Sequence, residues 1–275
     1  MVRRLNIYRI ATLMILFLLP GCVLIDKVGG DFSHDPDQIG KISAQAKQLI
    51  NSAFAGIDPD SLRDYHVHIV GADRHGGNDD DTCGAGSFIN EHFGNIFHLK
   101  KWIIGKVYMS GSGVTDLDSA YSQYVDRLDD LVKNFVYFRN GQPTNGSGKY
   151  YILALDCYYD KDGTPRPEKT TFYTPNNIVV ELARKHRNKF IPVISVNPYN
   201  PNWRDELDKN GEEGVKFVKW LPNAQGIDAC DPDIRPYYEK MKYWNMVLIT
   251  HVGEEKAVEA VNGQKLGNPL RFRVP

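Results

Sequence analysis

The sequence is poor in cysteine and has no excess of charge of either sign. Its 275 residues include four cysteines, and 33 basic residues stand against 34 acidic ones, which gives a formal net charge of -1. Such a balance provides no basic patch and no acidic tail, so it gives no indication of nucleic-acid binding and predicts a small-molecule partner. The apolar run over residues 10–19 is too short to span a bilayer comfortably as a helix.

What the chain does contain is an ordinary globular composition. Hydrophobic residues make up 42% of it and charged residues 24%, which suits one large domain or two small ones with a sizeable core. Cys83, Cys157 and Cys230 are widely spaced and form no CxxC pair, so neither a zinc knuckle nor a dense disulfide scaffold is indicated. We predict that they are small buried hydrophobic residues, with one disulfide among them as the alternative.

The first 21 residues have the form of a signal peptide, because arginines precede the short apolar run. The run ends in LPGC, residues 19–22, which resembles the lipobox of bacterial lipoproteins, although Pro20 departs from the usual small residue there. This ending predicts export to the bacterial cell envelope, with lipid attached to Cys22 and membrane contact only through that anchor or the signal segment. An ordinary signal peptide or membrane anchor with an incidental cysteine is the alternative.

The rest of the chain divides into a short tether and one domain. Residues 22–35 are of mixed composition and predict a tether, and apolar residues recur at helical spacing over 36–54. The globular domain is therefore expected to occupy residues 36–275. A loop at 71–87, rich in glycine and aspartate, is long enough to indicate a functional role.

Strands and helices are predicted to alternate along this domain. Strands are expected at 63–70, 150–159, 190–199, 215–222 and 246–253, and helices at 91–104, 116–138, 174–187, 202–214 and 233–244. Such alternation predicts an α/β protein with a parallel sheet. Periodicity alone does not choose between a (β/α)₈ TIM barrel and an open doubly wound sheet.

Two histidines lie two residues apart in the first predicted strand, within DYHVHIVG at 64–71. Alternate side chains of a strand share a face, so Asp64, His66 and His68 are expected to project together. Two imidazoles placed in this way can bind one divalent ion, and a neighbouring acid can orient a ring. A hydrogen-bonded or surface pair is the alternative for an isolated H-x-H.

Two further candidates stand at the ends of later strands. Lys219 lies near the carboxyl end of the fourth predicted strand, and His251 lies at the carboxyl end of the fifth. Parallel α/β folds form their sites at these ends. We therefore expect the carboxyl ends of the strands to form one site, the mouth of the fold, that contains His66, His68, Lys219 and His251.

With these residues in place, the sequence resembles the amidohydrolase superfamily. Within it, the resemblance is to the amidohydrolase-related group of metal-dependent hydrolases, which have a distorted (β/α)₈ barrel. The resemblance implies that His66 and His68 are first-strand metal ligands and that His251 is the fifth-strand ligand. Lys219 matches a lysine that some members carboxylate so that it bridges two metals, and an amine paired with a carboxylate is the alternative. The matching stretches, in family order, are DYHVHIVG, LALDCYYDKDGTP, TPNNIVVELARKH, FIPVISVNPYNP, VKFVKWLPNAQGID, ITHVGEEKAV and LGNPLRFRVP.

The resemblance implies hydrolysis of a C–N or C–O bond in a small molecule. A divalent ion, zinc first, with manganese, iron or nickel as alternatives, would polarise the scissile bond and lower the pKa of bound water. Asp156, Asn197, Tyr199 and Glu254, at or just past strand ends, are candidates for the substrate pocket. Capping and turn hydrogen bonds are the alternative role for these four residues.

The sequence departs from the family pattern at its carboxyl end. Residues 63–275 are fewer than the about 250 of a full barrel, and about five of eight strands are predicted. The family's sixth-strand histidine and eighth-strand aspartate have no counterpart, so the catalytic base is expected beyond Pro275. Three interpretations stay open: an active hydrolase, a truncated inactive fragment of one, or an envelope-anchored binding protein that uses the metal without turnover. Substrate and oligomeric state are left undecided.

Overall fold

The structure is a computed structural model that describes residues 43–58, 61–69, 103, 107, 111–114, 119, 122–128, 148–170, 172–255, 258 and 260–273. The predicted signal peptide, Cys22, the tether and the loop at 71–87 lie outside the described residues, as do most of the predicted helices at 91–104 and 116–138. Residues 122–128 of the latter are helical. No helix in the described ranges has the length and apolarity needed to cross a membrane.

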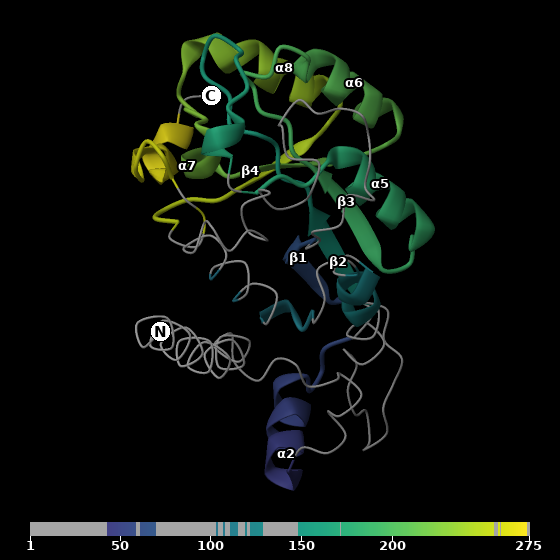
Figure 1. The fold of residues 1–275 in the computed structure, drawn as a ribbon. Helices are drawn as coiled ribbons and strands as arrows, with labels where there is room; N and C mark the ends of the chain where they lie inside the picture. The colour runs from purple at the N-terminus through teal and green to yellow at the C-terminus, as the bar shows by residue number, and fades with distance from the viewer. Residues whose placement is uncertain are drawn as a thin grey trace, which may run out of the picture.

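Five parallel strands form one sheet in the described part of the chain. Their order across the sheet is the order of the sequence, β1-β2-β3-β4-β5, and the sheet curls into a half-barrel (Figure 1). This confirms the predicted α/β class and parallel sheet, and it differs from a doubly wound sheet, whose strand order reverses at a switch point. The strands are β1 (Arg63–His68), β2 (Lys149–Leu153), β3 (Phe190–Ile194), β4 (Phe217–Trp220) and β5 (Val247–Thr250).

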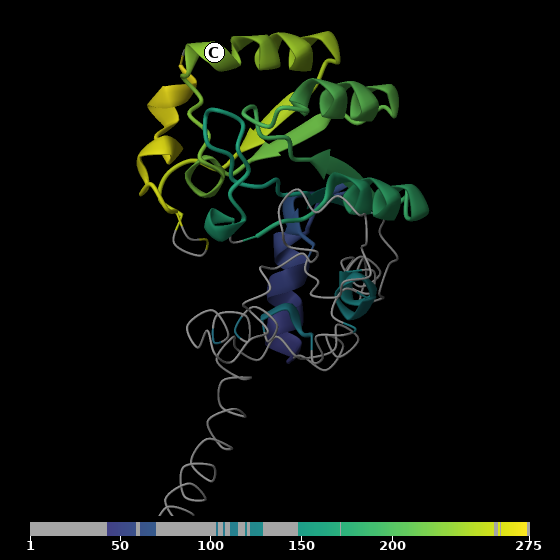
Figure 2. The same cartoon turned by 45° about the horizontal axis from the view of Figure 1, so that its top comes forward.

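Helices connect the later strands and cover the convex face of the sheet (Figures 1 and 2). Helix α5 (Asn176–Lys185) lies between β2 and β3, α6 (Trp203–Glu212) between β3 and β4, and α8 (Arg235–Tyr243) between β4 and β5. Each turns an apolar stripe inward, so that Leu207 on α6 and Tyr237 on α8 are fully buried. Burying one such large side chain contributes about 1.5–3 kcal/mol. The predicted helices and strands are confirmed here, with the strands shorter than expected.

Shorter elements surround the carboxyl ends of the strands. Helix α7 (Pro222–Gln225) follows β4 directly, and 3₁₀ turns of three or four residues lie both before and after it in the chain. Helix α2 (Ala44–Ala53) lies away from the sheet (Figure 1), and none of its residues is buried. The 3₁₀ turns are η7 (Pro167–Lys169), η8 (Pro232–Ile234), η9 (Lys265–Gly267) and η10 (Pro269–Phe272).

The two faces of the sheet carry different side chains because strand residues alternate in direction. On β4, Trp220 faces the helices, where it is fully buried and its Nε1 donates a 3.0 Å hydrogen bond to the Val196 carbonyl oxygen. Phe217 faces the concave side, where it packs with Tyr151 and Leu153 of β2. Lys219 is two residues after Phe217, so strand parity directs it to the concave face as well.

The cysteines depart from the prediction. Cys157 is buried, as predicted, but it is disulfide-bonded rather than a free thiol. Cys230 is a free thiol and is exposed, which contradicts the predicted burial. It stands in the turn after α7, where its Sγ lies 3.2 Å from Asp228 Oδ1, so a local polar contact replaces apolar packing. Cys83 lies outside the described residues.

Candidate functional site

The first strand contains a bulge that corrects one prediction. In the parallel pairing of β1 with β2, Asp64 lies opposite Tyr150 and Val67 lies opposite Ile152, so β1 has one more residue than β2 over this stretch. The extra residue breaks the alternation of side chains. Asp64 therefore lies on the helix-covered side with Tyr150 rather than with His68, and its Oδ1 accepts a 3.0 Å hydrogen bond from the His66 backbone N–H. Tyr65 takes the concave side instead, with its ring 4.4 Å from that of Tyr151.

The bulge leaves the two histidines of β1 directed at one point. The Nε2 atoms of His66 and His68 lie 3.0 Å apart. The His66 residue as a whole is exposed, but partial burial of its ring and the nearby charges of Lys219 and His251 lower its pKa. Burial lowers the pKa of His68 to about 3, with the charges of His66, Lys219 and His251 acting in the same direction. Both rings are therefore neutral at pH 7, the form in which an imidazole nitrogen can bind a metal ion.

Lys219 is the most unusual residue of the site. It is 1% exposed, and no side chain or carbonyl group in the described part of the chain makes a hydrogen bond or ion pair with its Nζ. Burial lowers the pKa of this amine from 10.5 to about 8, and the negative charge of Glu255 opposes the shift. A buried charged group without a hydrogen-bond partner is costly, so a position of this kind is a candidate for function.

His251 follows directly after β5 and has a carboxylate partner. Its Nε2 lies 3.5 Å from Glu255 Oε2, four residues further along the chain. The charge of Glu255 also raises the pKa of both His66 and Lys219 against the effect of burial. Glu255 therefore lies near all three groups, whereas the residue predicted from the sequence is its neighbour Glu254. The His-x-x-x-Glu spacing after the fifth strand was the signal that could have found it.

The structure thus brings together the four residues that the sequence placed at one mouth. The charges of Lys219 and His251 lower the pKa of both His66 and His68, in addition to burial, and the charge of Glu255 acts on His66 and Lys219 in the opposite direction. Within the described ranges, however, no group of three or more histidine, cysteine or acidic side chains has the geometry to hold a metal ion. Here the described chain offers three imidazoles, one amine and the Glu255 carboxylate beside His251.

Asp156 and Asn197 have their polar atoms occupied by loop contacts. Asp156 follows β2, is mostly buried, and accepts hydrogen bonds from the backbone N–H groups of Cys157 (2.7 Å) and Asn197 (2.6 Å). Burial raises its pKa to about 7. The Asn197 Nδ2 donates to the carbonyl oxygens of Cys157 (3.0 Å) and Gln225 (2.8 Å), so this side chain joins the loops after β2 and β3 to α7. These contacts are of the capping and turn type that the sequence analysis gave as the alternative.

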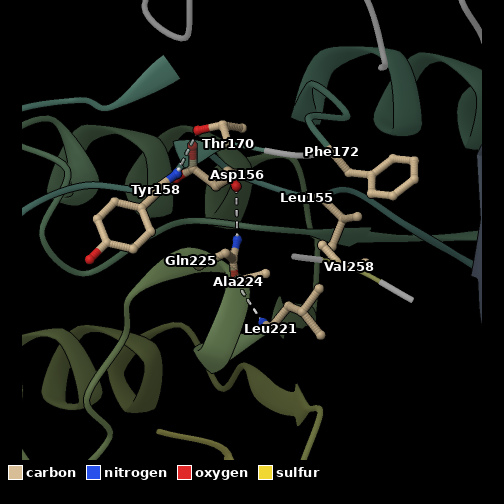
Figure 3. Close-up of a pocket in the computed structure, with 9 residues that line it drawn as sticks. All are labelled: Leu155, Asp156, Tyr158, Thr170, Phe172, Leu221, Ala224, Gln225 and Val258. Atoms are coloured by element: carbon tan, nitrogen blue, oxygen red, sulfur yellow. Dashed lines mark hydrogen bonds between the residues drawn. The ribbon is translucent and has the colours of Figure 1, made fainter. Parts of the chain in front are cut away.

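A small cavity lies beside Asp156 (Figure 3). It measures about 10 Å³, close to the smallest space that one water molecule needs. Gln225 Nε2 crosses its edge to donate to the Asp156 carbonyl oxygen at 3.1 Å. The space is too small for a substrate, so a substrate-binding role for Asp156 is not supported by this cavity.

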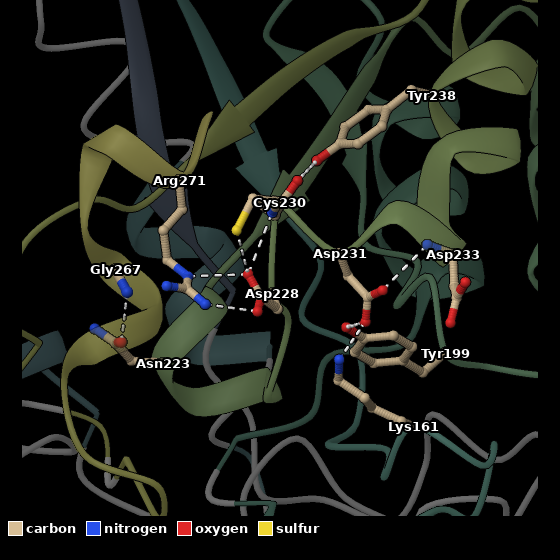
Figure 4. A network of polar contacts seen from close by, with 11 residues as sticks. Lys161, Tyr199, Asn223, Asp228, Cys230, Asp231, Asp233, Tyr238, Gly267 and Arg271 are labelled. Atoms are coloured by element: carbon tan, nitrogen blue, oxygen red, sulfur yellow. Dashed lines mark hydrogen bonds and ion pairs between the residues drawn. The ribbon is translucent and has the colours of Figure 1, made fainter. Parts of the chain in front are cut away.

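Tyr199 and Glu254 lie in two other settings. The Tyr199 hydroxyl donates a 2.8 Å hydrogen bond to Asp231, which also pairs with Lys161 (Figure 4). Burial, together with this hydrogen bond, raises the pKa of Tyr199 well above its ordinary value. Glu254 instead borders an open hollow of about 510 Å³, together with Lys265 and others. The hollow is wide open to solvent, so Glu254 lies beside a surface depression and not in an enclosed substrate pocket.

Comparison of the chain with protein-family models, with curated proteins and with solved structures finds no match.

Proposed function

We propose that the protein is a metal-dependent hydrolase of the amidohydrolase type, on a partial (β/α)₈ barrel. The observation that carries the proposal is the buried Lys219 Nζ, which lacks a partner among the described residues and shares the concave face with two neutral histidines. The motif resemblance described above supports the same family. The substrate in this proposal is a small molecule with a hydrolysable C–N or C–O bond.

The residues of β1 fit a divalent ion such as zinc. Two nitrogens that each bind one tetrahedral zinc at about 2.0–2.1 Å lie about 3.3 Å from each other. The His66 and His68 Nε2 atoms are 3.0 Å apart. An increase of this distance by about 0.3 Å would therefore let both nitrogens bind the same ion. Manganese, iron or nickel would suit the same imidazole donors.

Each residue has a task that its surroundings explain. His66 and His68 would hold the ion, and His251, paired with Glu255, would complete the donor set from β5. The lowered pKa of Lys219 makes a fraction of neutral amine available near pH 7, as both direct ligation and carboxylation by carbon dioxide require. A bound divalent ion supplies a Lewis acid and lowers the pKa of water toward neutrality.

The disulfide at Cys157 supports the proposal that the protein is exported to the cell envelope. Disulfides persist in oxidising compartments such as the periplasm and are rare in the cytosol. Cys157 is disulfide-bonded, and the chain begins with a signal-like segment that ends at Cys22. In this proposal lipid on Cys22 provides the membrane anchor.

The test is metal content measured on purified full-length chain. We expect about one zinc or manganese ion per chain, and we expect His66→Ala combined with His68→Ala to abolish binding because both β1 donors are lost. His186→Ala is the matched control, since this histidine follows α5 and lies against Phe190 on the helix side. Unchanged metal content in the double variant would refute the site assignment.

A panel of amide, ester and lactone substrates then separates turnover from capture. Hydrolysis that is lost in the double variant supports the enzyme. Metal binding without hydrolysis of any substrate favours the envelope-anchored binding protein or an inactive form.

A further inference from the structure

The Gln264 side chain makes hydrogen bonds to the backbone of Glu255, at the end of the segment that starts with His251. The Gln264 Oε1 accepts a 2.8 Å hydrogen bond from the Glu255 backbone N–H, and its Nε2 donates a 2.6 Å hydrogen bond to the Glu255 carbonyl oxygen. One amide side chain thus satisfies both backbone groups of a single residue. This two-point contact fixes the direction in which the Glu255 side chain leaves the backbone.

Asn223 of α7 holds the same loop two residues earlier. Its Nδ2 donates to the Gly253 carbonyl oxygen at 3.0 Å and to Gln264 Oε1 at 2.8 Å. Its Oδ1 accepts a 2.7 Å hydrogen bond from the Gly267 backbone N–H (Figure 4). Because Asn223 is 1% exposed, its hydrogen bonds are protected from competition by water.

Close backbone contact completes the arrangement at Gly267 of η9. The Gly253 N–H donates to the Gly267 carbonyl oxygen at 2.6 Å. A Cβ atom at residue 267 would lie 2.3 Å from the Gly253 carbonyl oxygen and 2.5 Å from Asn223 Nδ2. Only glycine permits this approach, so the segment after β5 is fastened at residues 253 and 255 by the segment 264–267.

We propose that Gln264 is a positioning residue that sets Glu255 against His251. The expected effect of Gln264 on metal affinity rests on the proposed metal-dependent function, whereas its hold on Glu255 does not. Within the described ranges the hydrogen bonds of the Gln264 side chain go to Glu255 and Asn223 and to none of the three histidines or Lys219. It acts through Glu255, whose Oε2 lies 3.5 Å from His251 Nε2 and whose charge reaches His66 and Lys219.

Loss of Gln264 should loosen Glu255 without removing any candidate ligand. Partners of this kind, which orient a ligand from behind, typically change metal affinity 10-fold to 100-fold when they are removed. The rest of the loop remains fastened through Asn223 and Gly267, so the fold should survive. The effect is therefore expected in the site more than in the melting temperature.

The experiment compares Gln264→Met with the wild-type full chain. Methionine has a similar length but lacks the amide, so both hydrogen bonds to Glu255 are lost. Lys265→Met is the matched control, because this neighbouring side chain is exposed and borders, like Gln264, the open hollow beside Glu254. Cobalt(II) titration followed by visible absorption reports affinity and coordination, and hydrogen exchange of the peptide over 251–255 reports the hold on Glu255.

In Gln264→Met we expect cobalt to bind about 10-fold more weakly, with a changed absorption spectrum and faster exchange at Glu255. The melting temperature should stay close to that of Lys265→Met. Gln264→Glu keeps the acceptor for the Glu255 N–H and loses the donor, so it should show a smaller effect; it also replaces the methionine variant if that variant does not fold.

Wild-type affinity together with wild-type exchange in Gln264→Met would overturn the inference. If the wild-type chain binds no cobalt, the proposed function fails, and the exchange measurement alone decides whether Gln264 holds Glu255. Faster exchange then supports the positioning role, and unchanged exchange refutes it.

Discussion

Replacing Lys219 by methionine should make the protein more stable while removing a residue of the proposed site. Lys219 is 1% exposed and has a pKa of about 8, lowered from 10.5 by burial. Methionine retains an apolar stem of comparable length and carries no charge. The substitution therefore tests directly whether the buried amine is a cost to the fold.

The size of the gain follows from the pKa shift. A shift from 10.5 to about 8, at about 1.4 kcal/mol for each unit of pKa, corresponds to a penalty on the order of 3 kcal/mol for the charged form. Below pH 8 the amine is charged in both native and unfolded chains, and the full penalty is present. Between pH 8 and pH 10.5 the unfolded chain binds the proton and the native chain does not, so wild-type stability rises with pH.

The assay is urea unfolding of the metal-free chain in carbon-dioxide-free buffer, at intervals from about pH 7 to pH 10.5. Lys219→Met should be about 3 kcal/mol more stable than wild type near pH 7, and the two should converge at high pH. Lys209→Met is the control, because this lysine is exposed on α6. A Lys219→Met variant that is no more stable than wild type near pH 7, with the control unchanged, would refute the reasoning.

Two other predictions concern the loops that support the site. Burial raises the pKa of Asp156 from 3.8 to about 7. Between these pH values the native chain keeps a proton that the unfolded chain has lost, so wild-type stability should fall as pH rises. Asp156→Asn should flatten this slope in urea unfolding near pH 5 and pH 8, and equal slopes in the two proteins would contradict the claim. Asn197→Ala should lower the free energy of unfolding by about 3–5 kcal/mol, because the carbonyl oxygens of Cys157 and Gln225 lose a buried donor. A loss below about 1 kcal/mol in thermal unfolding would show that other groups satisfy these two carbonyl oxygens.

The order of elements could be predicted from the sequence because the alternation of apolar segments is local information. Strands rich in β-branched and aromatic residues, such as FIPVI of β3, alternate with amphipathic segments such as α5, and this pattern specifies a parallel sheet. The position of Lys219 near a strand end, two residues after Phe217, likewise places it on the concave face. The four residues of the mouth could be selected for the same reason.

The contacts around these residues could not be predicted, because they depend on segments distant in the sequence. The bulge in β1 arises from pairing with β2, more than 80 residues away, and it moved Asp64 to the other face. The choice of Glu255 over Glu254 depends on which carboxylate the backbone turns toward His251, and Gln264 and Asn223 hold that backbone. The carbonyl oxygens that accept from Asn197 Nδ2 belong to the loop after β2 and to α7.

The sequence by itself determined that strands alternate with helices and that two histidines, a lysine and a further histidine stand at strand ends. This is so because periodicity and the polarity of parallel strands are encoded along the chain. Only the tertiary structure decided that the Lys219 amine is buried without a partner in the described chain, that His66 and His68 meet at 3.0 Å and that Glu255 lies beside His251. Burial and electrostatic coupling act through space, and they exist only once the strands have curled around one concave face.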